Sequence, residues 1–259
     1  MKRLVINTNE SVVCGSFHCG IAEVADSLSM SLVGDFDVTV VSLDGNGRIA
    51  NCAQDMRQLR NGVRTCTLLG VRYVLVKTED ARVEYINENV PELMINFGEI
   101  ELINKLDSRP QRIVCVLDLV ENLTEKIETL EKYDTILTVS NSYADIILSQ
   151  NKQVADRLLS KGFHGVTNGI LGDIFSPEKG IMLPAKYNST ILAGKITCKK
   201  RLCEQYGLPY DRYLALVMGR MIEVKGIDGI LDNIDKIYNS GGYTLIIGSG
   251  DKKYVDRLE

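Results

Sequence analysis

The stretch LALVMGRMIEVKGID, residues 214–228, joins an apolar run to a segment with helical spacing through a glycine. The run 214–218 is typical of a buried β-strand, and Gly219 leads from it into the predicted helix. Arg220 and Lys225 lie five residues apart across this turn. Their side chains and the free N–H groups of a helix start could converge on one anion, such as a diphosphate. Taken alone, the string is equally compatible with two solvated cations near a helix end.

Similar apolar runs recur along the whole chain and alternate with helical patterns. Most runs are near-continuous in Val, Ile and Leu, which is typical of parallel strands covered on both faces. The predicted strands are 4–7, 38–43, 65–69, 73–77, 93–97, 113–117, 135–139, 214–218 and 244–247. The predicted helices are 20–32, 99–106, 123–133, 143–149, 199–206, 226–238 and the segment from 252 onward. This alternation predicts an α/β fold with doubly wound parallel sheets.

Two places depart from the alternation. Residues 65–77 contain two strands around Gly70, which predicts a hairpin added to a sheet edge. Residues 167–209 are rich in turn dipeptides such as Asn168-Gly169 and Ser176-Pro177, which predicts a crossing between two domains. We therefore expect an N-terminal domain over 1–165 and a partial C-terminal domain over 166–259.

The bulk composition excludes several classes of protein. Hydrophobic residues make up 45% of the chain and charged residues 25%, which is the balance of a globular protein. The net charge of -4, without a basic stripe, argues against nucleic-acid binding. Seven irregularly spaced cysteines favour reduced thiols over a disulfide framework or a zinc site. No window approaches the roughly 18 apolar residues of a membrane span, so we expect a soluble, cytoplasmic protein without a membrane partner.

Four segments resemble the bacterial glycogen and starch synthase family in their order and spacing. They are KGFHGVTNGILGDIFSPEKG (161–180), LPAKYNSTILAGKITCKKRLCEQYGLP (183–209), LALVMGRMIEVKGIDGIL (214–231) and LIIGSGD (245–251). Weaker similarity covers MKRLVINTNE (1–10), GSFHCGIAEVADSLSMSL (15–32) and YDTILTVSNSYADII (133–147). Four co-linear matches are far more specific than one motif.

The resemblance implies a GT-B-like fold, with two Rossmann-like doubly wound parallel-sheet domains, the second one incomplete. It also implies a retaining glucosyltransferase that extends an α-1,4-glucan acceptor from ADP-glucose or UDP-glucose. Gly219, Arg220 and Lys225 would then bind the donor diphosphate. Preorganised cations at this position would stabilise the charge that builds on the leaving nucleotide. The family uses cationic side chains for this purpose, so we expect no metal and no cofactor besides the donor.

Further binding residues follow from the same resemblance. Gly248, Ser249 and Gly250 lie after a predicted strand, in the loop that borders the nucleotide in the family. A plain tight turn is an equal alternative there. Asn168 corresponds to an asparagine that faces the interdomain cleft, although Asn-Gly is also a common turn dipeptide. Gly20 opens the first predicted helix, where N–H groups could contact a phosphate.

The N-terminal region departs from the family pattern in its first loop. Phe17 stands where the family has a lysine and Cys19 stands at the first of its paired glycines. His18, as a neutral imidazole, would be a weak substitute for that lysine. Glu23 replaces a family aspartate and also suits the first turn of a helix, where an acid complements the dipole. Asp118 lies where the family carries a histidine that is important for the sugar.

The chain ends at Glu259, before the E-x(7)-E region at which family members hold the sugar. We therefore expect an incomplete or inactive glycosyltransferase. Two alternatives remain open: a noncatalytic glucan- or nucleotide-binding protein derived from such an enzyme, and a GT-B transferase with another sugar donor. An unfinished sheet edge at 244–247 further predicts self-association.

Overall fold

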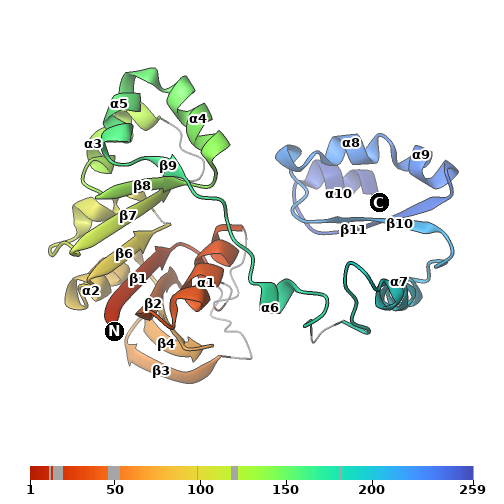
Figure 1. Ribbon diagram of the computed structural model, residues 1–259, viewed down its shortest axis with the longest axis horizontal. Helices are drawn as coiled ribbons and strands as arrows, with labels where there is room; N and C mark the ends of the chain where they lie inside the picture. The colour runs from red at the N-terminus through yellow and green to blue at the C-terminus, as the bar shows by residue number, and fades with distance from the viewer. Residues whose placement is uncertain are drawn as a thin grey trace. The chain divides into compact units, whose positions relative to one another are not determined.

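The computed structural model describes residues 1–11, 13, 20–45, 53–97, 99–117, 122–180 and 183–258, without the side chains of 173 and 174. The chain forms two compact units, Met1–Leu171 and Gly172–Glu259 (Figure 1). The predicted boundary after residue 165 and this division after Leu171 both follow β9 (His164–Gly165).

The first unit is built on one large sheet. Its described strands are β1 (Lys2–Thr8), β2 (Phe36–Leu43), β3 (Gln54–Arg60), β4 (Val63–Leu68), β5 (Val71–Val76), β6 (Leu93–Asn96), β7 (Arg112–Leu117), β8 (Thr135–Thr138) and β9. Their order is β3-β4-β5-β2-β1-β6-β7-β8-β9. The β3–β4 and β4–β5 pairs are antiparallel, and the other pairs are parallel. The strand β1 pairs with β2 on one side and with β6 on the other. The strands that follow β1 in the chain lie on the β2 side, and those from β6 onward lie on the opposite side. A topological switch point therefore lies between β1 and β6.

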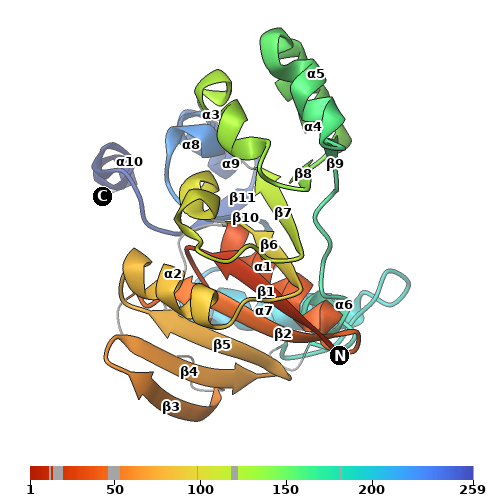
Figure 2. The same ribbon diagram turned by 90° about the vertical axis from the view of Figure 1, so that its left-hand side faces the viewer.

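Helices lie on both faces of this sheet. The helix α1 (Gly20–Leu32) lies on one face, while α2 (Glu79–Glu88) and α3 (Leu123–Leu130) lie on the other (Figures 1 and 2). The helices α4 (Asn141–Gln150) and α5 (Lys152–Ser160) follow β8, and a 3-10 helix, η1 (Ile100–Lys105), follows β6. Alternate strand residues such as Ile113, Cys115 and Leu117 are buried beneath the α2 and α3 side. The predicted doubly wound α/β fold is confirmed for this unit.

The second unit has a two-stranded parallel sheet within its described residues. It contains α6 (Gly172–Phe175), α7 (Ala193–Tyr206), β10 (Tyr213–Met218), η2 (Glu223–Lys225), α8 (Ile227–Leu231), α9 (Ile234–Asn239), β11 (Gly242–Ile247) and α10 (Lys252–Leu258). Met221, Ile227, Leu231 and Tyr254 form its small buried core. Val217 of β10 and Ile246 of β11 pack against that core, so α8 and α10 cover one face of the sheet.

Each range predicted as a strand overlaps an observed strand, and the predicted hairpin is β4–β5. The prediction of one helix over 226–238 was wrong, because α8 and α9 are separate. The Asn233 side chain donates a hydrogen bond to the carbonyl oxygen of Gly229 at 2.8 Å. Such a side-chain bond satisfies a carbonyl that a continuing helix would use. The predicted helix 99–106 is the 3-10 helix η1.

The predicted ranges miss six elements: β3, α2, α5, β9, α6 and η2. The sequence of β3 is polar and nearly all of it is exposed, so it lacks the apolar run of the other strands. The α2 sequence EDARVEYINE carries few apolar residues. Its start is nevertheless well defined, because the Thr78 side chain accepts a hydrogen bond from the Ala81 N–H at 3.2 Å.

Across the described residues, no helix is both long enough and apolar enough to cross a membrane. Among the described cysteines, Cys66, Cys115 and Cys203 are buried and Cys198 is half-buried, each as a free thiol. Burial raises the pKa of the Cys115 thiol to about 12, so this group is protonated near neutral pH.

Candidate functional site

The loops that follow β10 and β11 are joined to each other by backbone hydrogen bonds. The Gly219 N–H donates to the Ile247 carbonyl at 3.1 Å, and the Met221 N–H donates to the Ser249 carbonyl at 2.9 Å. In the opposite direction, the Asp251 N–H donates a hydrogen bond to the Met221 carbonyl, also at 2.9 Å. The two loops therefore extend the parallel pairing of β10 and β11 beyond the strands, at the carboxyl edge of the sheet.

Glycines permit this close approach. A Cβ atom on Gly248 would lie 1.9 Å from the Gly219 carbonyl oxygen, and one on Gly250 would lie 2.2 Å from the Met221 carbonyl oxygen. Any other residue at either position would force the two loops apart. The predicted nucleotide-contacting glycines thus have a structural role in the loop pairing. Ser249, between them, is exposed.

The paired loops direct Arg220 away from the core. Met221 is only 6% exposed and packs with Ile227 and Tyr254, whereas its neighbour Arg220 is exposed. Lys225 is also exposed, at the end of η2. Within 183–258, neither cation has a hydrogen bond or ion pair to another side chain. Both are therefore available to an anion.

The predicted helix start at residue 226 agrees within one residue with α8, which begins after both cations. Arg220 lies in the loop, and Lys225 closes η2 before the left-handed Gly226, with φ of 68°, allows α8 to begin at Ile227. The short α8 contributes little macrodipole, so the side chains carry the positive charge of this region.

The two predicted binding residues of the first unit lie near α1. Gly20 is exposed at the first position of α1. Asn168 is exposed in the 166–171 segment that follows β9. Glu23 lies in the first turn of α1, where its carboxylate accepts a 3.3 Å hydrogen bond from Ser27. Phe17, His18, Cys19 and Asp118 lie outside the described residues.

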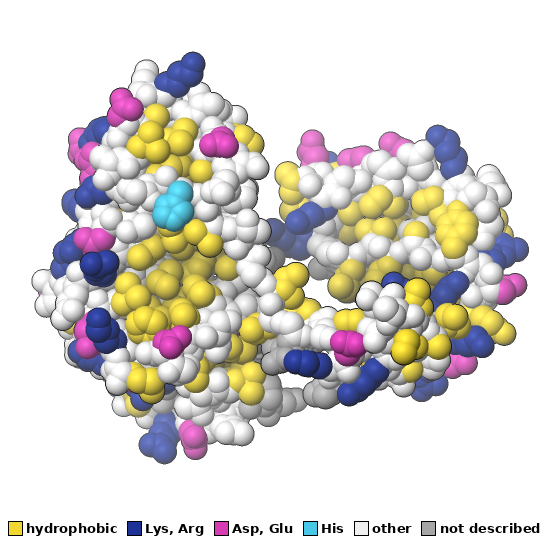
Figure 3. Space-filling model, in the orientation of Figure 1, with side chains coloured by type: hydrophobic (Ala, Val, Ile, Leu, Met, Phe, Trp, Pro, Cys, Tyr) yellow, Lys and Arg dark blue, Asp and Glu magenta, His cyan; other side chains and the backbone are white. Residues whose placement is uncertain are grey.

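Asn168 borders an apolar hollow of about 210 Å³. The hollow lies between α1, which contributes Val24 and Leu28, and the sheet, which contributes Val116 and Leu137. Apolar side chains gather on this part of the unit in Figure 3. The lining is poor in charge, so this hollow is unsuited to a phosphate.

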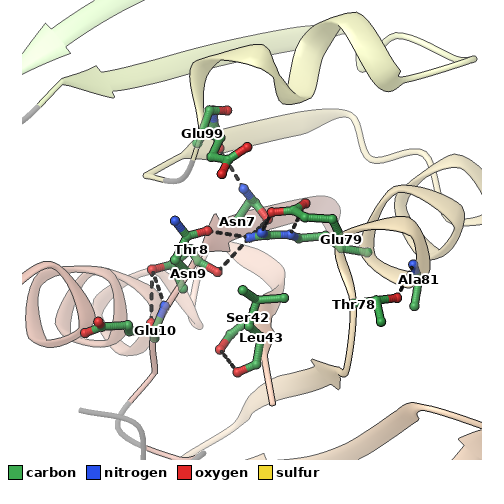
Figure 4. Close-up of polar contacts among 12 residues, drawn as sticks. Asn7, Thr8, Asn9, Glu10, Ser42, Leu43, Thr78, Glu79, Ala81 and Glu99 are labelled. Atoms are coloured by element: carbon green, nitrogen blue, oxygen red, sulfur yellow. Dashed lines mark hydrogen bonds and ion pairs between the residues drawn. The ribbon is translucent and has the colours of Figure 1, made fainter. Parts of the chain in front are cut away.

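A buried cation that the sequence did not indicate lies at the carboxyl end of β1. Arg82 of α2 is 1% exposed. Its Nη1 lies 2.9 Å from Asn9 Oδ1, 3.1 Å from the Thr8 carbonyl oxygen and 3.3 Å from Asn7 Oδ1. Its Nε donates to Glu79 at 3.0 Å, and its Nη2 forms an ion pair with the same carboxylate (Figure 4).

The hydrogen bonds continue from Asn7 to the end of β6. Asn7 Nδ2 donates to Asn96 Oδ1 at 2.7 Å, and Asn96 Nδ2 donates to Tyr133 Oη at 2.8 Å and to the Glu99 carbonyl oxygen at 3.1 Å. Tyr133 donates to the Ile100 carbonyl oxygen at 2.7 Å. The Arg82 guanidinium can only donate, so the Asn7 amide must direct its oxygen toward it. The Glu99 carbonyl can only accept, so the Asn96 amide must direct its nitrogen toward that carbonyl. This network holds the chain segments on both sides of the switch point.

Sequence reasoning missed this network because Arg82 lies in an unpredicted helix. One signal was available: the apolar runs of β1 and β6 end at Asn7 and Asn96. Within the ranges that the structure describes, no cluster of His, Cys, Asp or Glu could hold a metal ion.

Comparison with curated proteins identifies glycogen synthases as relatives. The chain is 34% identical to the glycogen synthase of Paracidovorax citrulli (strain AAC00-1) over 128 residues, which cover 47% of this chain and 25% of that protein. It is also 34% identical to the glycogen synthase of Francisella tularensis subsp. novicida (strain U112) over 128 residues, which cover 46% and 26%. The predicted resemblance to glycogen synthases is confirmed, and the match spans about a quarter of each relative's length.

Among solved structures, the chain is similar to an α,α-trehalose-phosphate synthase (UDP-forming) from Burkholderia vietnamiensis. The TM-score is 0.55 at 11% identity, and the alignment covers 100% of this chain and 67% of that chain. This likeness concerns the fold alone, and it confirms the predicted GT-B-like α/β class. No family model matches the chain.

Proposed function

We propose that this chain is part of a retaining glucosyltransferase of the glycogen synthase type, and that its second unit binds the diphosphate of a nucleotide-glucose donor. The observation that supports this most is the pair of joined loops with exposed Arg220 in one of them and exposed Lys225 at the end of η2; among the described residues, no side chain pairs with either cation. The sequence likeness to glycogen synthases supports a nucleotide-sugar donor, which we propose to be ADP-glucose or UDP-glucose.

In the proposed reaction, the two cations act on the leaving group. The bond from the sugar to the diphosphate breaks, the glucan hydroxyl becomes bonded to the anomeric carbon, and the hydroxyl proton is released. Negative charge builds on the diphosphate oxygens as the bond breaks. The Arg220 guanidinium can contact two oxygens through its planar fork, whereas Lys225 acts as a point charge. Both would stabilise the transition state more than the bound donor.

The test combines donor binding and chain extension. Calorimetric titration of the chain with ADP-glucose, UDP-glucose and ADP should give saturable binding that Arg220→Ala weakens strongly. ADP-glucose with a maltooligosaccharide primer should yield longer glucans when supplied to the protein expressed from its complete gene. Absence of nucleotide binding by the chain would overturn the donor assignment.

A noncatalytic descendant that binds nucleotide or glucan is the second candidate. Phe17, at the position of the family lysine, favours it, because this substitution removes a cation from the first loop. This candidate predicts binding of ADP or maltooligosaccharide with no chain extension. A GT-B transferase with another sugar donor is distinguished by a donor screen, since Arg220 and Lys225 would recognise only the diphosphate.

We also propose self-association through the second sheet. In its described residues, only β10 and β11 pair, which leaves the outer edge of each strand without a strand partner. The face opposite α8 and α10 exposes apolar side chains: Leu216 is 52% exposed and Met218 75%. Parallel strands are usually covered on both faces, and free edges pair readily with other chains.

A further inference from the structure

We propose that Tyr254 and Arg257 of α10 are positioning residues, which fix the Lys225 segment by holding Asp228. This inference rests on the proposed function, and it names the part of the unit that would orient the diphosphate site. Tyr254 is 0% exposed, and its ring lies in the core with Met221 and Ile227.

The contacts of Asp228 carry the proposal. The Tyr254 hydroxyl donates to Asp228 Oδ2 at 2.7 Å, and Arg257 Nη1 donates to Asp228 Oδ1 at 2.8 Å. Both carboxylate oxygens therefore have a donor from α10. Arg257 also donates to Asp232 at 2.7 Å, at the end of α8. The Asp228 carboxylate raises the pKa of the Tyr254 phenol, so the hydroxyl stays protonated and donating at neutral pH.

The position of Asp228 in the chain connects these contacts to the site. Asp228 lies three residues after Lys225, and Gly226 and the buried Ile227 lie between them. A second link reaches η2 itself, because Lys253 Nζ lies 3.9 Å from the Glu223 carboxylate. The helix α10 follows directly from the Gly248–Gly250 loop. It therefore ties that loop to the segment that carries Lys225.

Without this tie, η2 and α8 would be held chiefly by the burial of Met221, Ile227 and Leu231, which is non-directional. Hydrogen bonds to both oxygens of one carboxylate restrict its orientation. The backbone that carries Lys225 would then be in place before the anion arrives, which lowers the ordering cost of binding.

Tyr254→Phe is the discriminating variant. It keeps the ring in the core and removes one donor from a carboxylate whose side chain is 53% exposed and can bind water instead. We expect a Kd for ADP about fivefold higher, the size of one ordinary hydrogen bond, because water can replace the lost donor, with unchanged stoichiometry. In a Lys225→Ala background, Tyr254→Phe should change the Kd no further, because it acts through Lys225.

The matched control is Arg201→Ala in α7, which removes an exposed ion pair to Glu204 and contacts neither loop. Its Kd for ADP should equal that of the wild type. Three results would overturn the positioning role and leave the proposed function intact. They are an unchanged Kd in Tyr254→Phe, an equal increase in Kd in the wild-type and Lys225→Ala backgrounds, and a fall in stoichiometry alone. Absence of ADP binding by the wild-type chain would instead overturn the proposed function, and this inference with it.

Discussion

Replacement of Arg82 by methionine should destabilise the first unit by about 2–6 kcal/mol, because two buried acceptors lose their donor. The variant keeps the length of the side chain and removes every donor. Asn9 is exposed and Glu79 is 31% exposed, so water can satisfy both. Asn7 and Thr8 are 0% exposed, and the oxygens that accept from Arg82 would lose that donor. At about 1–3 kcal/mol for each buried unsatisfied group, these two account for the expected loss.

The assay is urea unfolding followed by far-UV circular dichroism, with the transition of the first unit fitted separately. Arg157→Met serves as the control within the same unit, because Arg157 pairs with Glu131 where both side chains are partly exposed. We expect that control to unfold near the wild-type urea concentration, since surface ion pairs contribute little. A loss below about 1 kcal/mol in Arg82→Met, in the range of surface pairs, would refute the account of the buried network.

Two further predictions concern the second unit. Gly250→Ala should separate the paired loops, because the added Cβ would lie 2.2 Å from the Met221 carbonyl oxygen; we expect ADP binding to weaken more than tenfold, by an order-of-magnitude estimate for lost preorganisation. Gly229→Ala, whose Cβ meets no atom within 4 Å, is its control, and equal Kd values in calorimetry would contradict the loop account. Leu216→Glu should shift sedimentation-velocity profiles toward the monomer, whereas Leu159→Glu, on the exposed surface of the first unit, should not. If Leu216→Glu sediments like the wild type, the β10–β11 sheet does not mediate association.

The strands were predictable because burial on both faces leaves near-continuous apolar runs, as in β2 and β7. The same physical reason explains what was missed. The edge strand β3 is solvated and carries no such run, and the buried side of α2 mixes Arg82 with Ile86. Neither element differs from a loop by hydrophobic pattern alone.

The position of the two paired loops was predictable from residue type and chain position. Each of the two loops begins with a glycine that follows an apolar run, Gly219 in one and Gly248 in the other. Glycine permits the close backbone approach that the structure has at Gly248 and Gly250. The contacts of Asp228 with Tyr254 and Arg257 could not be predicted, since they join residues 26 and 29 positions apart. The break between α8 and α9 likewise depends on the hydrogen bond from the Asn233 side chain to the Gly229 carbonyl. The hydrophobic periodicity of the sequence does not indicate this bond.

Calorimetric titration of ADP into the wild-type chain and into Arg220→Ala tests the central claim most directly. The account predicts saturable binding by the wild type. It also predicts a Kd at least tenfold higher in the variant, an order-of-magnitude figure for one charge-assisted contact to phosphate. Equal affinity in both proteins, or no binding by the wild type, would contradict the assignment of this loop to a nucleotide diphosphate.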